Sequence, residues 1–87
     1  MYNYQDQRAF VFTEEGQVMF LSIRDKTAKL LKSSGACRLQ EMISKQSGST
    51  WDMIACVDRL VELNEIKEIS QANSCGQHRV FISAKME

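Results

Sequence analysis

The sequence contains no proline and only four glycines in 87 residues. Both residue types interrupt helices, so their scarcity favours helices with short connections over a loop-rich or disordered chain. Eleven basic and eleven acidic residues cancel, which is not the charge balance of a strongly basic nucleic-acid binder. No hydrophobic run is long enough to cross a membrane, and the N-terminus lacks the basic start and apolar core of a secretory signal. The composition therefore predicts a single cytoplasmic globular domain with no membrane association.

Histidine and cysteine are also scarce. The three cysteines, Cys37, Cys56 and Cys75, are widely spaced and odd in number, so we expect reduced thiols rather than a disulfide framework. The C-x-x-H spacing of Cys75 and His78 offers only two ligands, where a structural zinc takes four. A single histidine, without a nucleophile motif or a glycine-rich phosphate loop, supplies no catalytic constellation. We therefore predict a non-enzymatic protein with no metal and no cofactor.

Apolar residues recur at helical spacing in three segments. The first helix is expected to begin after Thr13 as N-cap and to end at Gly35, a residue suited to a left-handed C-cap. The second is expected over about residues 38–45. The third is expected from Thr50 to Leu63, with a capping box formed by Ser49 and Asp52. The first predicted helix should bury one arc of residues: Met19, Phe20, Ile23, Thr27, Leu30 and Leu31, widened by Leu21 and Ala28.

The third predicted helix separates its residues between two faces. The inward face contains Met53, Ile54, Cys56, Val57, Leu60, Val61 and Leu63, and the outward face contains Trp51, Asp52, Ala55, Asp58, Arg59 and Glu62. Residues 66–70 and 78–83 are expected to be strands around a polar hairpin tip at 71–77. Residues 8–12 suggest a short strand or an extended arm, and residues 1–7 and 84–87 are expected to be frayed.

The stretch from Val57 to Ile66 resembles the end of the recognition helix in bacterial winged helix-turn-helix regulators. In that superfamily a valine–any–arginine–leucine pattern closes the helix, and a glycine and an isoleucine open the first wing strand. Asn64 stands at the glycine position, and asparagine also adopts the left-handed conformation. The resemblance implies an α+β, mainly α fold over residues 1–87: a winged helix-turn-helix with three helices and a two- or three-stranded wing.

The same resemblance implies a DNA-binding or transcription-associated protein whose third helix enters the major groove of double-stranded DNA. The residues placed at the groove are Thr50, Trp51 and Arg59, and those placed at phosphates are Arg38, Lys45 and Arg79. One electrically neutral copy would bind DNA weakly. We therefore expect a homodimer, formed through the first long helix or the segment 8–12, to double the contacts.

The charge of the third helix supports an alternative function. Its outward face has Asp52, Asp58 and Glu62 against Arg59 alone, a pattern that a phosphate lattice repels. With Trp51 as an aromatic anchor, these acidic residues would form a surface for a protein partner or for self-association. The fold resemblance favours DNA and the charge pattern favours protein, so the sequence leaves both functions open.

Overall fold

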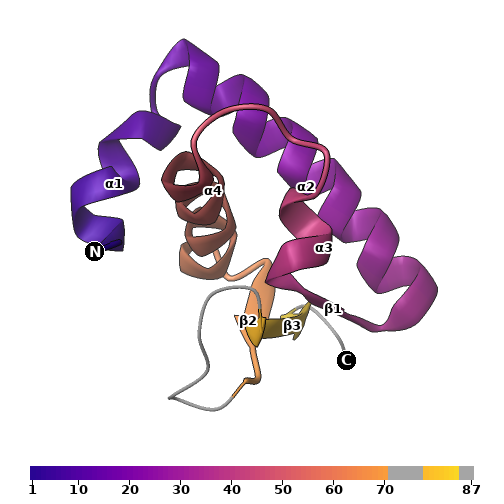
Figure 1. The fold of residues 1–87 in the computed structure, drawn as a ribbon. Helices are drawn as coiled ribbons and strands as arrows, with labels where there is room; N and C mark the ends of the chain where they lie inside the picture. The colour runs from indigo at the N-terminus through magenta and orange to yellow at the C-terminus, as the bar shows by residue number, and fades with distance from the viewer. Residues whose placement is uncertain (71–77, 85–87) are drawn as a thin grey trace.

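The structure is a computed structural model that describes residues 1–70 and 78–84. The described residues form four helices and three short strands, so the expected α+β, mainly helical class is confirmed (Figure 1). In chain order the elements are α1 (Tyr4–Val11), α2 (Glu14–Ser34), β1 (Ala36–Arg38), α3 (Leu39–Ile43), α4 (Thr50–Glu62), β2 (Ile66–Glu68) and β3 (Val80–Ser83). No helix among these described residues is both long enough and apolar enough to pass through a lipid bilayer.

The three strands form one antiparallel sheet in the order β1-β3-β2. Phe81 on the central strand is paired with Cys37 on one side and with Glu68 on the other. The third strand of the sheet is therefore β1, where the sequence analysis expected only a connection into the second helix. With three residues each, both outer strands are shorter than a typical strand. The residues predicted as the hairpin tip, 71–77, lie outside the described part of the chain.

The N-terminal segment is a helix, so the prediction of a strand or extended arm at residues 8–12 is wrong. The prediction that residues 1–7 are frayed is also wrong for residues 4–7, which form the first half of α1. Asn3 caps this helix by accepting a hydrogen bond from the backbone N–H of Gln5. Tyr4 and Val11, seven residues apart, lie on one face of α1, and Val11 is completely buried. Packing against the rest of the protein therefore favours a helix over the β tendency of this aromatic stretch.

Helix α2 has the boundaries that its capping residues predict. The hydroxyl of Thr13 accepts a hydrogen bond from the N–H of Gly16, and Gly35 ends the helix with a left-handed φ of 80°. Leu21 and Ala28 were expected to widen the buried arc, but both are exposed. Gly16 sits where α1 and α2 meet, and a Cβ at this position would lie 1.9 Å from the carbonyl oxygen of Phe10.

Every element contributes to the core, and α4 contributes most, with five buried side chains. Its largest fully buried side chains include Phe81, Ile23, Leu39, Met42, Leu60 and Val11. Cys37 and Cys56 are buried in this core, as expected for small apolar residues. Burial raises the pKa of the Cys37 thiol to about 11 and that of the Cys56 thiol to about 12, so both are protonated at neutral pH.

Two local predictions around α4 have different outcomes. Asn64, with φ of 60°, takes the left-handed conformation expected after the helix. The predicted capping box is wrong, because the Ser49 side chain makes no capping hydrogen bond and the Asp52 carboxylate accepts a hydrogen bond from Gln7 instead. The competing partner on α1 therefore replaces a contact that the local sequence alone would suggest.

Candidate interaction surface on α4

Helix α4 lies between α1 on one side and α2 and α3 on the other (Figure 1). Its residues Met53, Cys56, Val57 and Leu60 are buried in the core, as predicted. Ala55 was expected to point outward, but it is completely buried. The reason is α1, which packs along the flank of α4 that the sequence analysis assigned to solvent.

The N-terminal segment contacts all three acidic residues proposed as partner-binding residues. The Tyr2 hydroxyl donates a hydrogen bond to Asp58 Oδ2 at 2.7 Å, and the Tyr4 hydroxyl donates to Glu62 Oε1 at 2.6 Å. The Gln7 side-chain amide donates to Asp52 Oδ1 at 3.1 Å. Each acidic side chain is therefore already engaged by residues about fifty positions away in the sequence.

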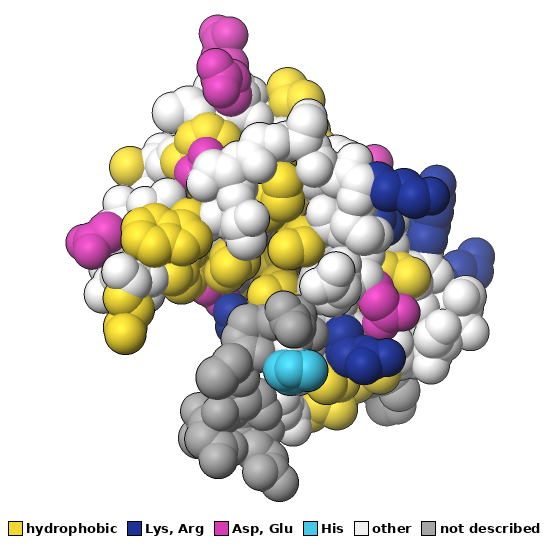
Figure 2. Space-filling view, viewed as in Figure 1, with side chains coloured by type: hydrophobic (Ala, Val, Ile, Leu, Met, Phe, Trp, Pro, Cys, Tyr) yellow, Lys and Arg dark blue, Asp and Glu magenta, His cyan; other side chains and the backbone are white. Residues whose placement is uncertain are grey.

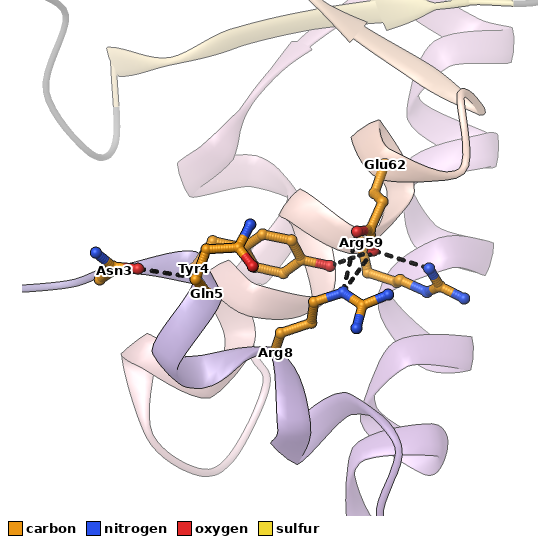
Figure 3. A network of polar contacts seen from close by, with 6 residues as sticks. All are labelled: Asn3, Tyr4, Gln5, Arg8, Arg59 and Glu62. Atoms are coloured by element: carbon orange, nitrogen blue, oxygen red, sulfur yellow. Dashed lines mark hydrogen bonds and ion pairs between the residues drawn. The ribbon is translucent and has the colours of Figure 1, made fainter.

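Glu62 is the centre of a polar cluster at the outer edge of this contact (Figure 3). Arg8 Nε lies 3.0 Å from Glu62 Oε2, and an Arg59 guanidinium nitrogen lies 2.8 Å from Glu62 Oε1. The Tyr4 hydrogen bond, followed by that of Arg59, lowers the pKa of Glu62 to about 2. Burial and the same hydrogen bond raise the pKa of Tyr4 to about 12.

Arg59 was placed at the DNA groove by the sequence analysis, but its charge is engaged within the chain. Besides its ion pair with Glu62, its guanidinium lies 4.9 Å from the ring centroid of Phe12, and that of Arg8 lies 5.0 Å from the same centroid. Such cation–π contacts add to the ion pairs in holding both guanidinium groups at the α1–α4 contact.

Arg79 was expected to contact a phosphate, and it is also neutralised within the chain. Its guanidinium lies 2.8 Å from Asp58 Oδ1 and 2.9 Å from Glu68 Oε1, and it covers the ring of Phe81. Only 18% of the Arg79 side chain is exposed. This arginine therefore ties β2 and β3 to α4, and a phosphate would have to compete with two carboxylates for it.

The other two predicted phosphate contacts are different. Arg38 and Lys45 are exposed on either side of α3, and neither has an ion pair with a carboxylate of the described residues. Thr50, the remaining predicted groove residue, is exposed at the first position of α4. Arg38, Lys45 and Thr50 thus keep the accessibility that a binding role requires.

One arc of α4 lies outside its contact with α1 and is only partly covered by the described residues. Trp51, Ile54, Asp58 and Val61 follow one another at helical spacing along it, and Asp58 is largely covered by Tyr2 and Arg79. The Trp51 side chain is 44% exposed and meets the Tyr2 ring edge-on at 6.3 Å between centroids. Ile54 and Val61 are only partly buried. We call Trp51, Ile54 and Val61 the apolar arc.

A cleft of about 550 Å³ lies between α3 and α4, next to the apolar arc. Leu39, Ile43, Met53 and Ile54 provide its apolar lining, and the remaining lining residues are glutamine, serine, threonine and glycine. No charged side chain lines it. On this side of the molecule hydrophobic and uncharged side chains gather over α3 and α4 (Figure 2).

Comparison with known proteins identifies no relative: no protein-family model, no curated protein and no solved structure matches this chain. Within residues 1–70 and 78–84, no three histidine, cysteine, aspartate or glutamate side chains form a group that could hold a metal ion. Cys75 lies outside these residues.

The sequence analysis missed the residues that occupy the flank of α4, which are Tyr2, Tyr4, Gln7 and Arg8. A signal for them was present, since Asn3 is a favoured N-cap residue and Tyr4, Gln7 and Val11 repeat at helical spacing. The short length of this segment and its Phe10-Val11-Phe12 sequence favoured a strand instead.

Proposed function

We propose that the chain has a winged helix-turn-helix fold to which α1 is added. In support, the elements from α2 to β3 follow the order expected from the resemblance: a long helix, a short helix, a third helix and then a strand pair. The central position of β3 in the sheet and the left-handed Asn64 before β2 are compatible with such a wing.

We further propose that this fold serves as a non-enzymatic protein-interaction module, and that the apolar arc of α4 is its contact surface. The observation that supports this most strongly is the chemistry of α4. The flank with Asp52 and Glu62 is occupied by α1, while the apolar arc outside that contact presents the exposed Trp51 and the partly buried Ile54 and Val61. Aromatic and aliphatic anchors of this kind supply most of the binding energy at protein interfaces.

DNA binding is the second candidate, and the observation that favours it is the accessibility of Arg38 and Lys45. Two free cations beside α3 would contact phosphates, but a specific complex typically neutralises several more. Arg59 and Arg79 would have to leave their carboxylates to add to them. We therefore rank a protein partner ahead of DNA.

Site-specific photocrosslinking tests the proposed surface. A photoreactive amino acid replaces Ile54 in the intact chain, and a matched control places it at Ser33, an exposed residue near the end of α2. We expect the Ile54 probe to form adducts reproducibly with one partner protein, which mass spectrometry identifies. The Ser33 probe should form none with that protein. Adducts with nucleic acid, or identical adduct patterns from both positions, would contradict the proposal.

Fluorescence anisotropy with random duplex DNA at low and high salt tests the second candidate directly. Binding that is tight at low salt and falls steeply with added salt would establish phosphate contacts and favour DNA. We expect weak binding or none. The mass of the protein in solution, measured alongside, reports whether the apolar arc is used for self-association.

A further inference from the structure

The cleft between α3 and α4 has features that specify a type of partner, and this inference rests on the proposed protein-interaction function. Its walls are apolar at Leu39, Ile43, Met53 and Ile54, and no charged side chain lines it. Ile54 belongs to both the cleft and the apolar arc, so the two meet at this residue, while Asp58 with its partners Tyr2 and Arg79 lies between Ile54 and Val61. A partner must therefore present an apolar, uncharged face to this surface.

Beside the cleft, basic side chains outnumber acidic ones on the α3 side. Arg38 immediately precedes α3, and Lys45 directly follows Ser44, the C-cap of α3. Both side chains are exposed, and neither has an ion pair with a carboxylate of the described residues. Lys26 of α2 also reaches Ser44, where its ammonium donates to the serine hydroxyl at 2.6 Å. The only acidic residue on α3, Glu41, accepts a hydrogen bond from the backbone N–H of Arg38. With Arg38, Lys45 and Lys26 against the single carboxylate of Glu41, the border of the cleft on the α3 side has a net positive charge.

The length of the surface limits the size of its occupant. The apolar arc runs along α4 from Trp51 to Val61, which at 1.5 Å per residue corresponds to about 15 Å. A partner helix of roughly three turns covers that length. Such a helix carries apolar residues at i, i+3 or i+4, and i+7 on one face.

We propose that the surface formed by the α3–α4 cleft and the apolar arc binds a short amphipathic helix of a partner protein, whose apolar face is flanked by acidic residues. The apolar face fills the uncharged cleft and contacts Trp51, while the acidic flank meets Arg38 and Lys45. DNA would also be attracted to Arg38 and Lys45. However, a cleft that no charged side chain lines adds no ion pair to its phosphates, and Arg38 and Lys45 alone offer few neutralising contacts.

A displayed library of helical peptides of random sequence, selected against the intact protein, tests this inference. We expect enriched peptides that combine aspartate or glutamate with apolar residues at helical spacing. Their binding is measured by the fluorescence of Trp51, the only tryptophan in the chain, whose emission should shift to shorter wavelength as its exposed ring is covered.

Three variants locate the binding. We expect Ile54→Glu, and separately the double variant Arg38→Glu/Lys45→Glu, to weaken the enriched peptide about tenfold or more. Lys32→Glu, which reverses an exposed charge on α2 outside this cleft, should leave the affinity unchanged. Circular dichroism of each variant confirms that it is folded, and the selected peptide with its acidic residues changed to glutamine provides the matched ligand control.

The outcomes separate this inference from the proposed function. Enriched peptides that are neutral or basic, yet lose affinity with Ile54→Glu, overturn the acidic-helix inference and leave the interaction module standing. Enriched peptides that are insensitive to Ile54→Glu overturn the assigned surface. No enrichment overturns the inference, and salt-dependent binding of duplex DNA in the same preparation would replace the interaction module with DNA recognition.

Discussion

Replacing Gly16 with alanine should release α1 from α4. A Cβ at this position would lie 1.9 Å from the carbonyl oxygen of Phe10 and 2.8 Å from Val11 Cα, where ordinary contact begins at 3.4 Å. Both obstacles are backbone atoms, so no side-chain rotation removes the clash. The angle between α1 and α2 must change, and the contacts of α1 with α4 change with it.

Two opposing contributions decide the magnitude. Alanine favours a helix over glycine by up to about 1 kcal/mol, which would stabilise α2 if there were room. Loss of the burial of Val11 costs roughly 1.5–3 kcal/mol, and the clash adds to it. We therefore expect a net loss of about 2 kcal/mol in the free energy of unfolding, which corresponds to a melting temperature lowered by roughly 10 °C in a domain of this size.

The assay combines urea unfolding with hydrogen exchange. In Gly16→Ala the backbone amides of residues 4–11 should exchange faster while those of the core elements remain protected. Ser33→Ala, an exposed change in the same helix, serves as the control and should be neutral or slightly stabilising. A Gly16→Ala protein at least as stable as the wild type, with α1 still protected, would refute the assignment of Gly16 as the contact point between the two helices.

Two other substitutions test individual side chains. In Glu62→Gln, the loss of stability relative to wild type should be full above the ordinary carboxyl pKa of 4.5 and should vanish as pH falls toward about 2, because the native contacts lower the pKa of this group; urea unfolding across that range measures it. An equal difference at all pH values would show that the carboxylate charge is not responsible. Thr27 is 2% exposed and its hydroxyl has no hydrogen-bond partner within residues 1–70 and 78–84, so Thr27→Val should stabilise the protein by about 1 kcal/mol in thermal unfolding. A destabilised Thr27→Val protein would mean that this hydroxyl does have a partner.

The long helices were predictable because their signals are local. Thr13 and Gly35 mark the ends of α2, and the apolar spacing of α4 identifies its core face within thirteen residues. The coarse fold class followed from these helices and the strand pair after them. The assignment to the winged helix-turn-helix superfamily stays a prediction.

The elements that sequence reasoning missed depend on distant partners. Helix α1 has eight residues, too few for stability in isolation, and its contacts with α4 join positions about fifty residues apart. Strand β1 has three residues and exists as a strand through its pairing with β3. Neither partner can be identified from the residues within the element itself.

The candidate site was only half predictable for the same reason. Asp52, Asp58 and Glu62 were interpreted as a free acidic surface because polar residues on one face of a helix usually meet water. In the structure they meet Tyr2, Tyr4 and Gln7. A polar face can be covered by another polar helix when hydrogen-bond donors are matched to acceptors one by one, and hydrophobic periodicity does not report that matching.

This arrangement changes which property of α4 bears on function. From the sequence, the negative charge of α4 argued against DNA and for a protein partner or self-association. Arg8, Arg59 and Arg79 now lie in ion pairs with Glu62 and Asp58, so α4 does not present that charge as a free acidic surface. The case for a protein partner therefore no longer depends on acidity. It depends on the apolar arc. Beside the cleft, Arg38 and Lys45 have no ion pair with a carboxylate of the described residues and outnumber Glu41 of α3, so the partner expected there is acidic.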